Sequence, residues 1–283
     1  MKVTSSIYQE QQEVSDVRSM VEVYQEVAAM RMQKVKDSIL ESRQYYESLV
    51  VLVREVRPWL HISTTSQSQK TTSNQTKTAL FFSANTGLYG DIIQKACREF
   101  LSYIDKEHAE AAVVGLAGKR MVESSRKGLS VAYFPCDDAH PTKEQIFAIV
   151  SYAMQFGHTE VFHGRFINLI SQVPYRSTLS GDTEVDRAVG SDWQKTSLSY
   201  LFEPTTKEIT SVVEGEILGS VVEQILHESN FSKFASRMMH LDHAIQNIDE
   251  RLMGIEIEGR RIGRRLENKK QRARLAGRAL WQT

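Results

Sequence analysis

The chain has few cysteines, few prolines, no net charge and no long apolar run. Its two cysteines, Cys97 and Cys136, are too few for a disulfide framework and lack the CxxC spacing of a zinc site. We therefore expect reduced thiols in a cytosolic protein. No stretch of eighteen apolar residues is present, and residues 1–6 lack the apolar segment of a signal peptide. Any role at a membrane is therefore expected to be peripheral.

The zero net charge is the sum of two unequal parts. Lys plus Arg and Asp plus Glu each number 35 among 283 residues. The part before Arg260 has eight more acidic than basic residues, and the part after it holds a single acid, Glu267. The terminal part, called here the basic segment, contains these nine cations: Arg260, Arg261, Arg264, Arg265, Lys269, Lys270, Arg272, Arg274 and Arg278. Composition excludes a uniformly basic chain, but it does not exclude a local basic surface.

All five prolines lie between residues 58 and 204, which leaves both ends free of helix breakers. Residues 4–57 also lack glycine, and apolar or neutral residues recur there in steps of three and four. We predict an N-terminal coiled-coil helix over 1–60, which at about 1.5 Å per residue is too long for a compact domain and needs a partner. Its predicted contact positions are Val14, Val17, Val21, Tyr24, Ala28, Met32, Val35, Ile39, Tyr46, Leu49, Val53 and Val56.

The C-terminal end supplies that partner as a predicted coiled-coil helix over 207–283, which again contains no proline. We expect the two ends to pair antiparallel across an inserted domain; the alternative is that each covers a large core as an ordinary globular helix. Five glycines in this helix (215, 219, 254, 259 and 263) either admit a close partner helix or lie on an exposed face. The heptad seam consists of Met238, Leu241, Ile245, Ile248, Leu252, Ile255, Gly259, Ile262 and Leu266, and it continues more weakly at Lys269, Ala273, Ala276 and Leu280.

The middle of the chain is predicted to be a small Rossmann-like α/β domain. A polar Ser/Thr/Gln tract over 61–77 is predicted to be a linker, and the domain follows over 78–206. A short apolar run, a glycine turn at 87–90 and a helical pattern open it in the order typical of an α/β unit. The expected strands are 78–83, 111–116, 130–134, 159–163 and 199–202, and the expected helices are 91–103 and 142–156.

No catalytic, metal or cofactor site emerges from the sequence. Residues 115–120 fail the Walker A pattern, and the turn at 83–90 has no GxGxxG, so a structural turn is favoured there over a phosphate site. His240 and His243 lie three residues apart on a helix, but their neighbour Leu241 belongs to the seam, which favours solvated side chains over a metal site. Asp137 and Asp138 are interpreted as the turn that starts the helix at 142.

Five segments in order resemble the gamma subunit of F-type ATP synthases. Residues 27–34 are similar to a V-A-A-x-[KR]-M-x-[KR] segment, and residues 83–90 to an S-x-x-x-G-L-C-G turn, with Tyr89 where cysteine is usual. Residues 166–174 resemble F-x-N-x-x-S-Q-x-P, and residues 200–204 resemble Y-x-[FY]-E-P. The fifth segment is similar to S-x-x-A-x-R-M-x-x-x-x-x-A-x-x-N and consists of Ser232, Ala235, Arg237, Met238, Ala244 and Asn247.

The resemblance implies a non-catalytic rotor shaft that binds no cofactor or metal. The shaft would turn inside the catalytic hexamer of alpha- and beta-type subunits, as a single copy. Its α/β domain, the foot, would dock on an epsilon-type subunit and the membrane c-type ring, on the cytoplasmic or matrix face of the membrane. The resemblance carries over a foot-domain turn of Gly87, Leu88 and Gly90, and partner contacts at Val27, Ala28, Ala29, Arg31, Met32, Lys34, Arg237, Met238, Asn247, Arg260, Arg264, Lys269 and Gly277.

The C-terminal end departs from this family. The family's last helical turns are mostly apolar, whereas the basic segment here suggests contact with acidic surfaces inside the head. The regulatory cysteine insertion of the chloroplast form is absent, so no thiol control of that kind is expected. The alternative function is a coiled-coil protein that binds nucleic acid through the basic segment, although Ile262 and Leu266 keep the seam inside it.

Overall fold

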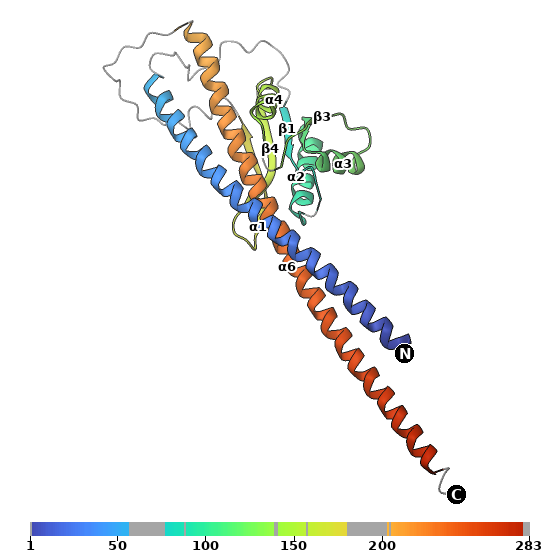
Figure 1. Ribbon diagram of the computed structural model, residues 1–283. Helices are drawn as coiled ribbons and strands as arrows, with labels where there is room; N and C mark the ends of the chain where they lie inside the picture. Colours follow the sequence, from blue (N-terminus) through green and yellow to red (C-terminus); the bar gives the residue numbers. More distant parts are fainter. Residues whose placement is uncertain are drawn as a thin grey trace. The chain divides into compact units, whose positions relative to one another are not determined.

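The computed structural model describes residues 2–56, 77–87, 89–138, 141–156, 158–179, 203 and 205–279 (Figure 1). Two long helices, α1 (Lys2–Val56) and α6 (Thr206–Ala279), flank a domain with a sheet. The fold class predicted from the sequence is confirmed. The chain forms two compact units: residues 1–28 with 238–283, and residues 29–237. We call them the shaft unit and the sheet unit and describe each by itself.

In the shaft unit, α1 and α6 pair antiparallel. Asp249 Oδ1 lies 2.6 Å from Arg18 Nε, and farther along α6 a Cβ added to Gly259 would lie 3.5 Å from Ile7 Cγ2. Residue numbers thus fall along α1 as they rise along α6. The predicted seam positions of α6 from Met238 to Ile262 are all at least partly buried. The alternation of three and four residues therefore predicted the contact face of α6.

On α1 the predicted contact positions need a correction. Val17 and Tyr24 are 49% and 55% exposed, and the half-buried residues beside them are Arg18 and Gln25. Strict alternation of three and four steps from Val14 passes through these two polar residues. Arg18 is accommodated because Asp249 of the opposite helix accepts its hydrogen bond. The sequence pattern alone favoured the neighbouring apolar side chains.

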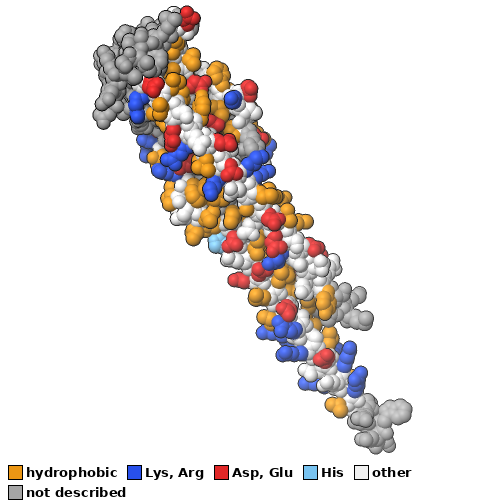
Figure 2. Space-filling view, turned by 60° about the vertical axis from the view of Figure 1, so that its left-hand side comes forward, with side chains coloured by type: hydrophobic (Ala, Val, Ile, Leu, Met, Phe, Trp, Pro, Cys, Tyr) orange, Lys and Arg blue, Asp and Glu red, His pale blue; other side chains and the backbone are white. Residues whose placement is uncertain are grey.

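The seam ends before the C-terminal part of α6. Leu266 is 37% exposed, and the side chains of residues 264–275 are all exposed. The weaker continuation of the seam predicted at Lys269 and Ala273 is therefore not buried within this chain. Figure 2 shows Lys and Arg side chains gathered over this end of the helix. The cations of the basic segment from Arg260 to Arg274 are thus exposed to solvent or to a partner.

The sheet unit contains a five-stranded sheet in the order β3-β2-β1-β4-β5. All neighbouring strands are parallel except β5, which pairs antiparallel with β4. The strands are β1 (Lys77–Phe82), β2 (Glu110–Val114), β3 (Val131–Phe134), β4 (His158–Phe166) and β5 (Gln172–Leu179). The helices between them are α2 (Ile92–Glu107), α3 (Leu116–Ser125) and α4 (Lys143–Ala153). We call these strands and helices, with the turns that join them, the sheet domain.

Alternate side chains of the strands build a core on each face of the sheet. On one face, Phe81 and Val113 pack with Phe100 of α2. On the other face, residues such as Leu80 pack with Ile149 of α4 and with a row on α6. That row consists of Leu218, Val222, Ile225 and Leu226. Here α6 covers a core like an ordinary globular helix, so the alternative interpretation of the long helices applies to this part.

The long helices also meet each other in the sheet unit. Leu49 and Val53 of α1 form a small cluster with Ile217 of α6, and Val213 packs against it. Tyr45 donates a hydrogen bond of 2.9 Å to Glu216 Oε2. The direction of the pairing is again antiparallel.

Two elements of the sheet domain were not predicted. Helix α3 has no side-chain cap and contains Gly118, so it lacked helix signals. Strand β5 is an edge strand with partly exposed residues and Pro174, which an edge tolerates. The predicted strand 199–202 and the linker residues 61–76 lie outside the described residues, and the predicted domain boundaries stay predictions.

Candidate functional site at the junction of the C-terminal helix and the sheet domain

The turn after β1 is held by main-chain hydrogen bonds to two neighbouring segments. Ser83 N donates to Val114 O at 2.9 Å, and Ala117 N donates to Ala84 O at 2.8 Å. Gly115 has a φ of +96°, and a Cβ there would lie 2.8 Å from Ala84 O. The glycine next to Leu116 thus permits this close approach of the two backbones.

Asn85 ties the turn to the segment that follows β3. Its Nδ2 donates to Cys136 O at 2.5 Å, and its Oδ1 accepts from Leu116 N at 3.1 Å. Its backbone N–H donates to Asp138 Oδ2 at 2.8 Å. These bonds bring the carboxylate of Asp138, whose side chain is 11% exposed, beneath the turn.

Helix α6 places Lys233 into this arrangement. Lys233 Nζ donates to Ser83 O at 2.7 Å and lies 3.3 Å from Asp138 Oδ1. The residue is only 3% exposed, and burial lowers the pKa of its ammonium below the usual value, while Asp138 acts in the opposite direction. A buried ammonium needs such a partner because an uncompensated charge in the interior is costly.

Arg237 lies one helical turn after Lys233 and contacts the same turn of the sheet domain. Its Nη2 donates to Gly87 O at 2.6 Å and lies 3.4 Å from Thr86 Oγ1. The guanidinium carbon stands 4.0 Å from the ring centroid of Tyr89, at a distance typical of a cation–π contact. Burial, followed by the charge of Asp138, raises the pKa of the Tyr89 hydroxyl above its usual value.

These contacts fix one face of α6 to the sheet domain. Lys233 and Arg237 are four residues apart and so lie on the same side of the helix, with Phe234 between them packed edge-to-face on Tyr89 at 5.9 Å. Turning or sliding α6 would separate two buried cations from their acceptors. We call these contacts of Lys233 and Arg237 with the turn after β1 the clamp.

The structure brings together two of the residues carried over from the resemblance, Gly87 and Arg237. Gly90 of the same turn has a φ of +64°, and Leu88 lies outside the described residues. On α1, Ala28 is buried, Val27 and Met32 are half-buried, and the others are exposed: Ala29, Arg31 and Lys34. On α6, Met238 is half-buried, Gly277 lies in the helix, and the others are exposed: Asn247, Arg260, Arg264 and Lys269. Their contacts with partners stay predictions.

The role of Asp138 differs from the sequence interpretation. The helix cap of α4 is Thr142, in a capping box with Gln145, and Asp138 instead pairs with Lys233. Sequence reasoning missed Lys233 altogether. The sequence did offer one indication of its role. Lys233 is the single lysine in Asn230–Arg237, a stretch of mostly small or apolar residues, and a lysine buried among such residues needs an acceptor.

No metal site is found among the described residues, because no group of three or more His, Cys, Asp or Glu side chains lies together there. His240 and His243 are exposed, as expected. His158 Nε2 lies 2.9 Å from Glu160 Oε1. His163 is buried, and burial lowers its pKa to about 4.

Comparison with protein families and curated proteins adds evidence of kinship. A family model described as ATP synthase matches residues 4–262. The ATP synthase gamma chain of Clostridium perfringens (strain 13 / Type A) is 22% identical over 257 residues, which is 88% of either chain. The gamma chain of Chloroherpeton thalassium is 23% identical over 266 residues, with 86% of either chain covered.

Two solved structures share the fold. One is the central stalk and c-ring structure of the Tetrahymena thermophila mitochondrial ATP synthase, with a TM-score of 0.57, 16% identity, and coverage of 80% of this chain and 99% of that chain. The other is the Euglena gracilis mitochondrial ATP synthase rotor, with a TM-score of 0.51, 13% identity, and coverage of 89% and 99%.

Proposed function

Because this chain belongs to the gamma-subunit family of the ATP synthases, we propose that it is the rotating, non-catalytic shaft of such a complex. It turns inside a hexamer of alpha- and beta-type subunits, where the ATP chemistry takes place. Its rotation couples ion flow through a membrane ring to ATP synthesis or hydrolysis. It binds no cofactor for this task.

The clamp between α6 and the sheet domain is the observation that carries this proposal. A shaft transmits torque only if its helix and its foot turn as one body. Lys233 and Arg237 meet that demand, because both are largely buried and hydrogen-bonded to the turn after β1. Pulling a buried cation from its acceptors costs several kcal/mol, roughly 3–5 for a buried pair.

The partners follow from the same proposal. The foot docks on an epsilon-type subunit and a c-type ring, and one copy of the chain serves each complex, with no nucleic acid. The names of the structural neighbours, a central stalk with its c-ring and a rotor, support these partners. Among the described residues no helix is long and apolar enough to cross a membrane. We propose a peripheral position for the chain, on the cytoplasmic or matrix face of an energy-transducing membrane.

The basic segment is proposed to meet acidic surfaces inside the head. Its side chains from Arg264 to Arg274 are exposed within this chain. Contacts of this kind are weakened by salt because the Debye length is only about 10 Å at 0.1 M. Replacing the nine cations with Gln should loosen assembly at low salt, measured as subunit retention on size exclusion. Unchanged retention and torque would contradict this role.

Co-purification is the primary test of the proposed function. We expect stoichiometric alpha- and beta-type ATPase subunits with an affinity-tagged copy of this chain. Recovery of the chain alone, bound to nucleic acid, would favour the alternative function through the basic segment and refute the shaft.

Coupling provides the second test. The variant Arg237→Met keeps an unbranched side chain but loses the hydrogen bond to Gly87 and the contact with Tyr89. We expect ATP hydrolysis to continue while ATP-driven ion pumping per ATP falls. Lys36→Met, at an exposed position of α1, is the control and should pump like the parent. Equal pumping by both variants would contradict a torque-bearing clamp.

A further inference from the structure

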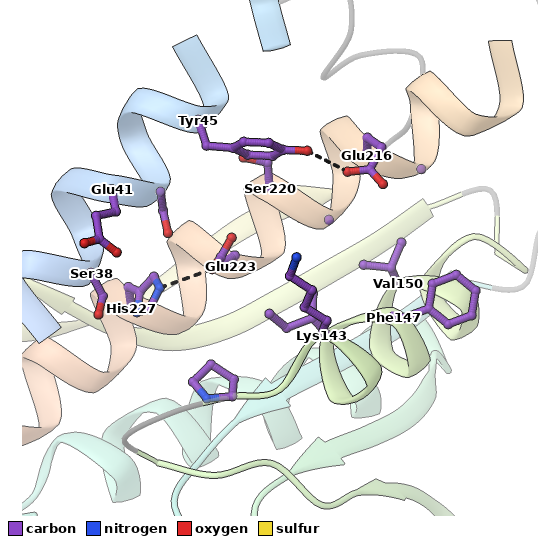
Figure 3. Close-up of a pocket in the computed structure, with 15 residues that line it drawn as sticks. Ser38, Glu41, Tyr45, Lys143, Phe147, Val150, Glu216, Ser220, Glu223 and His227 are labelled. Atoms are coloured by element: carbon purple, nitrogen blue, oxygen red, sulfur yellow. Dashed lines mark hydrogen bonds and ion pairs between the residues drawn. The ribbon is translucent and has the colours of Figure 1, made fainter. Parts of the chain in front are cut away.

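A groove in the sheet unit has one helix as its floor and two others as its walls (Figure 3). Helix α6 forms the floor, and side chains of α1 and α4 line the two sides. Its volume is about 640 Å³. The floor runs from Gly215 to His227, a length of about 18 Å at 1.5 Å per residue. This length corresponds to about three turns of a fourth helix laid beside the other three.

Two glycines leave the floor of the groove open. A Cβ added at Gly215 or Gly219 would meet nothing within 4 Å. Each glycine costs a helix roughly 1 kcal/mol relative to Ala, and no described part of this chain occupies the space that they leave. Gly164 is different, because a Cβ there would lie 2.7 Å from Ser232 Oγ. The glycines at 215 and 219 are four residues apart, so they clear a single face of α6 for a close neighbour.

Buried polar groups without partners line the same groove. Ser220 is 3% exposed and His227 is 5% exposed, and both side chains belong to the lining. Among the described residues, neither Ser220 Oγ nor the two ring nitrogens of His227 have a hydrogen-bond partner. The nearest carboxylate oxygen, Glu223 Oε1, lies 3.6 Å from His227 Nε2. Unsatisfied buried groups are costly, so a ligand that supplies partners would be stabilised here.

The charge of the groove is predominantly negative. Its lining includes the carboxylates of Glu41, Glu216 and Glu223, against the single ammonium of Lys143. One rim is apolar, because Phe147 of α4 is 71% exposed. An occupant with both a cation and an apolar face complements this surface.

We propose that the groove is a docking site for an amphipathic helix of another polypeptide, with small residues over Gly215 and Gly219 and a Lys or Arg beside Glu216 and Glu223. Two helical walls and a glycine floor suit a helix in a groove, recognised by residues on successive turns. The apolar face of that helix packs on Phe147. The inference rests on the proposed function in that the second polypeptide is expected in the same complex.

Cross-linking in intact cells tests the proposal. Phe147→p-benzoylphenylalanine places a photoreactive ring at the rim, and illumination should join this chain to one other polypeptide. Mass spectrometry should map the linkage to a helix that carries a Lys or Arg. Adding Gly219→Leu should reduce the product at least tenfold. The matched control is Val212→Leu, at a 63% exposed position of the same helix outside the groove lining, and it should leave the yield unchanged.

A melting-temperature measurement tests whether a substitution at Gly219 disturbs folding of the chain itself. In the isolated chain, Gly219→Ala should not lower the melting temperature, because its Cβ enters open space and Ala favours the helix. In cells the same variant should weaken the cross-link. A melting temperature below that of the parent would show that the floor is not open, and would overturn the proposal.

The remaining outcomes are equally decisive. No product, a product within this chain, a product with a second copy, or a product insensitive to Gly219→Leu overturns the docking site. Absence of alpha- and beta-type subunits from the purified complex refutes the proposed function instead. In that case the cross-link formed in intact cells still decides whether a helix occupies the groove.

Discussion

Replacing Lys233 with methionine should destabilise the sheet unit by about 3 kcal/mol, at the lower end of the range for breaking one side of a buried ion pair. The change leaves Ser83 O without its donor and the carboxylate of Asp138 without its ammonium. The loss is held to that lower end because Asn85 N–H still donates to Asp138 at 2.8 Å. For a unit of this size, about 3 kcal/mol corresponds to roughly 6–12 °C in melting temperature.

The assay is scanning calorimetry of the isolated chain, with a double variant to isolate the charge. Adding Asp138→Asn to Lys233→Met removes the uncompensated carboxylate and should restore about 2 kcal/mol. Lys36→Met, at an exposed position, should change stability by less than about 0.5 kcal/mol. The reasoning fails if Lys233→Met costs less than about 1 kcal/mol, or if the double variant is less stable than the single one.

Three further predictions concern the sheet domain. Gly115→Ala should cost at least about 2 kcal/mol in urea unfolding, because a Cβ would meet Ala84 O at a positive φ; a neutral effect would contradict the close approach. Folding lowers the pKa of His163 from 6.5 to about 4. Between these two pH values the unfolded chain binds more protons than the folded chain, so the free energy of unfolding should drop by up to about 3 kcal/mol as the pH falls through this range. His163→Asn should abolish this pH dependence. Burial raises the pKa of Cys97 and Cys136 to about 11, so iodoacetamide at pH 8 should alkylate both only after unfolding, and rapid native labelling would be inconsistent with their burial.

The sequence predicted the long helices and four of the strands because their signals are local. The spacing of apolar residues in α6 specifies its contact face without knowledge of the partner. On α1 the same reasoning chose Val17 instead of Arg18, because the partner of Arg18 on the opposite helix, Asp249, is 231 residues away in the sequence. Strand β5 was missed because an edge strand needs no continuous apolar pattern.

The candidate site could be predicted only in part. The turn with Gly87 was visible as a glycine pattern, and Arg237 came from the resemblance. The pairing of Lys233 with Asp138 joins residues 95 positions apart, and no local pattern indicates which acid meets which base. The groove at Gly215 and Gly219 illustrates the same limit. Their spacing was visible, but whether the space beside them is filled depends on the fold around α6.

The pairing of Arg18 with Asp249 has a consequence for how the protein is made. The two residues are separated by 231 positions, so the ribosome finishes α1 long before its partner exists. At about 5–20 residues per second, the delay is roughly 10 to 50 seconds. During that time the apolar side of the first helix has no α6 to cover it. The pairing of the two helices is therefore expected to close only after nearly the whole chain has been made.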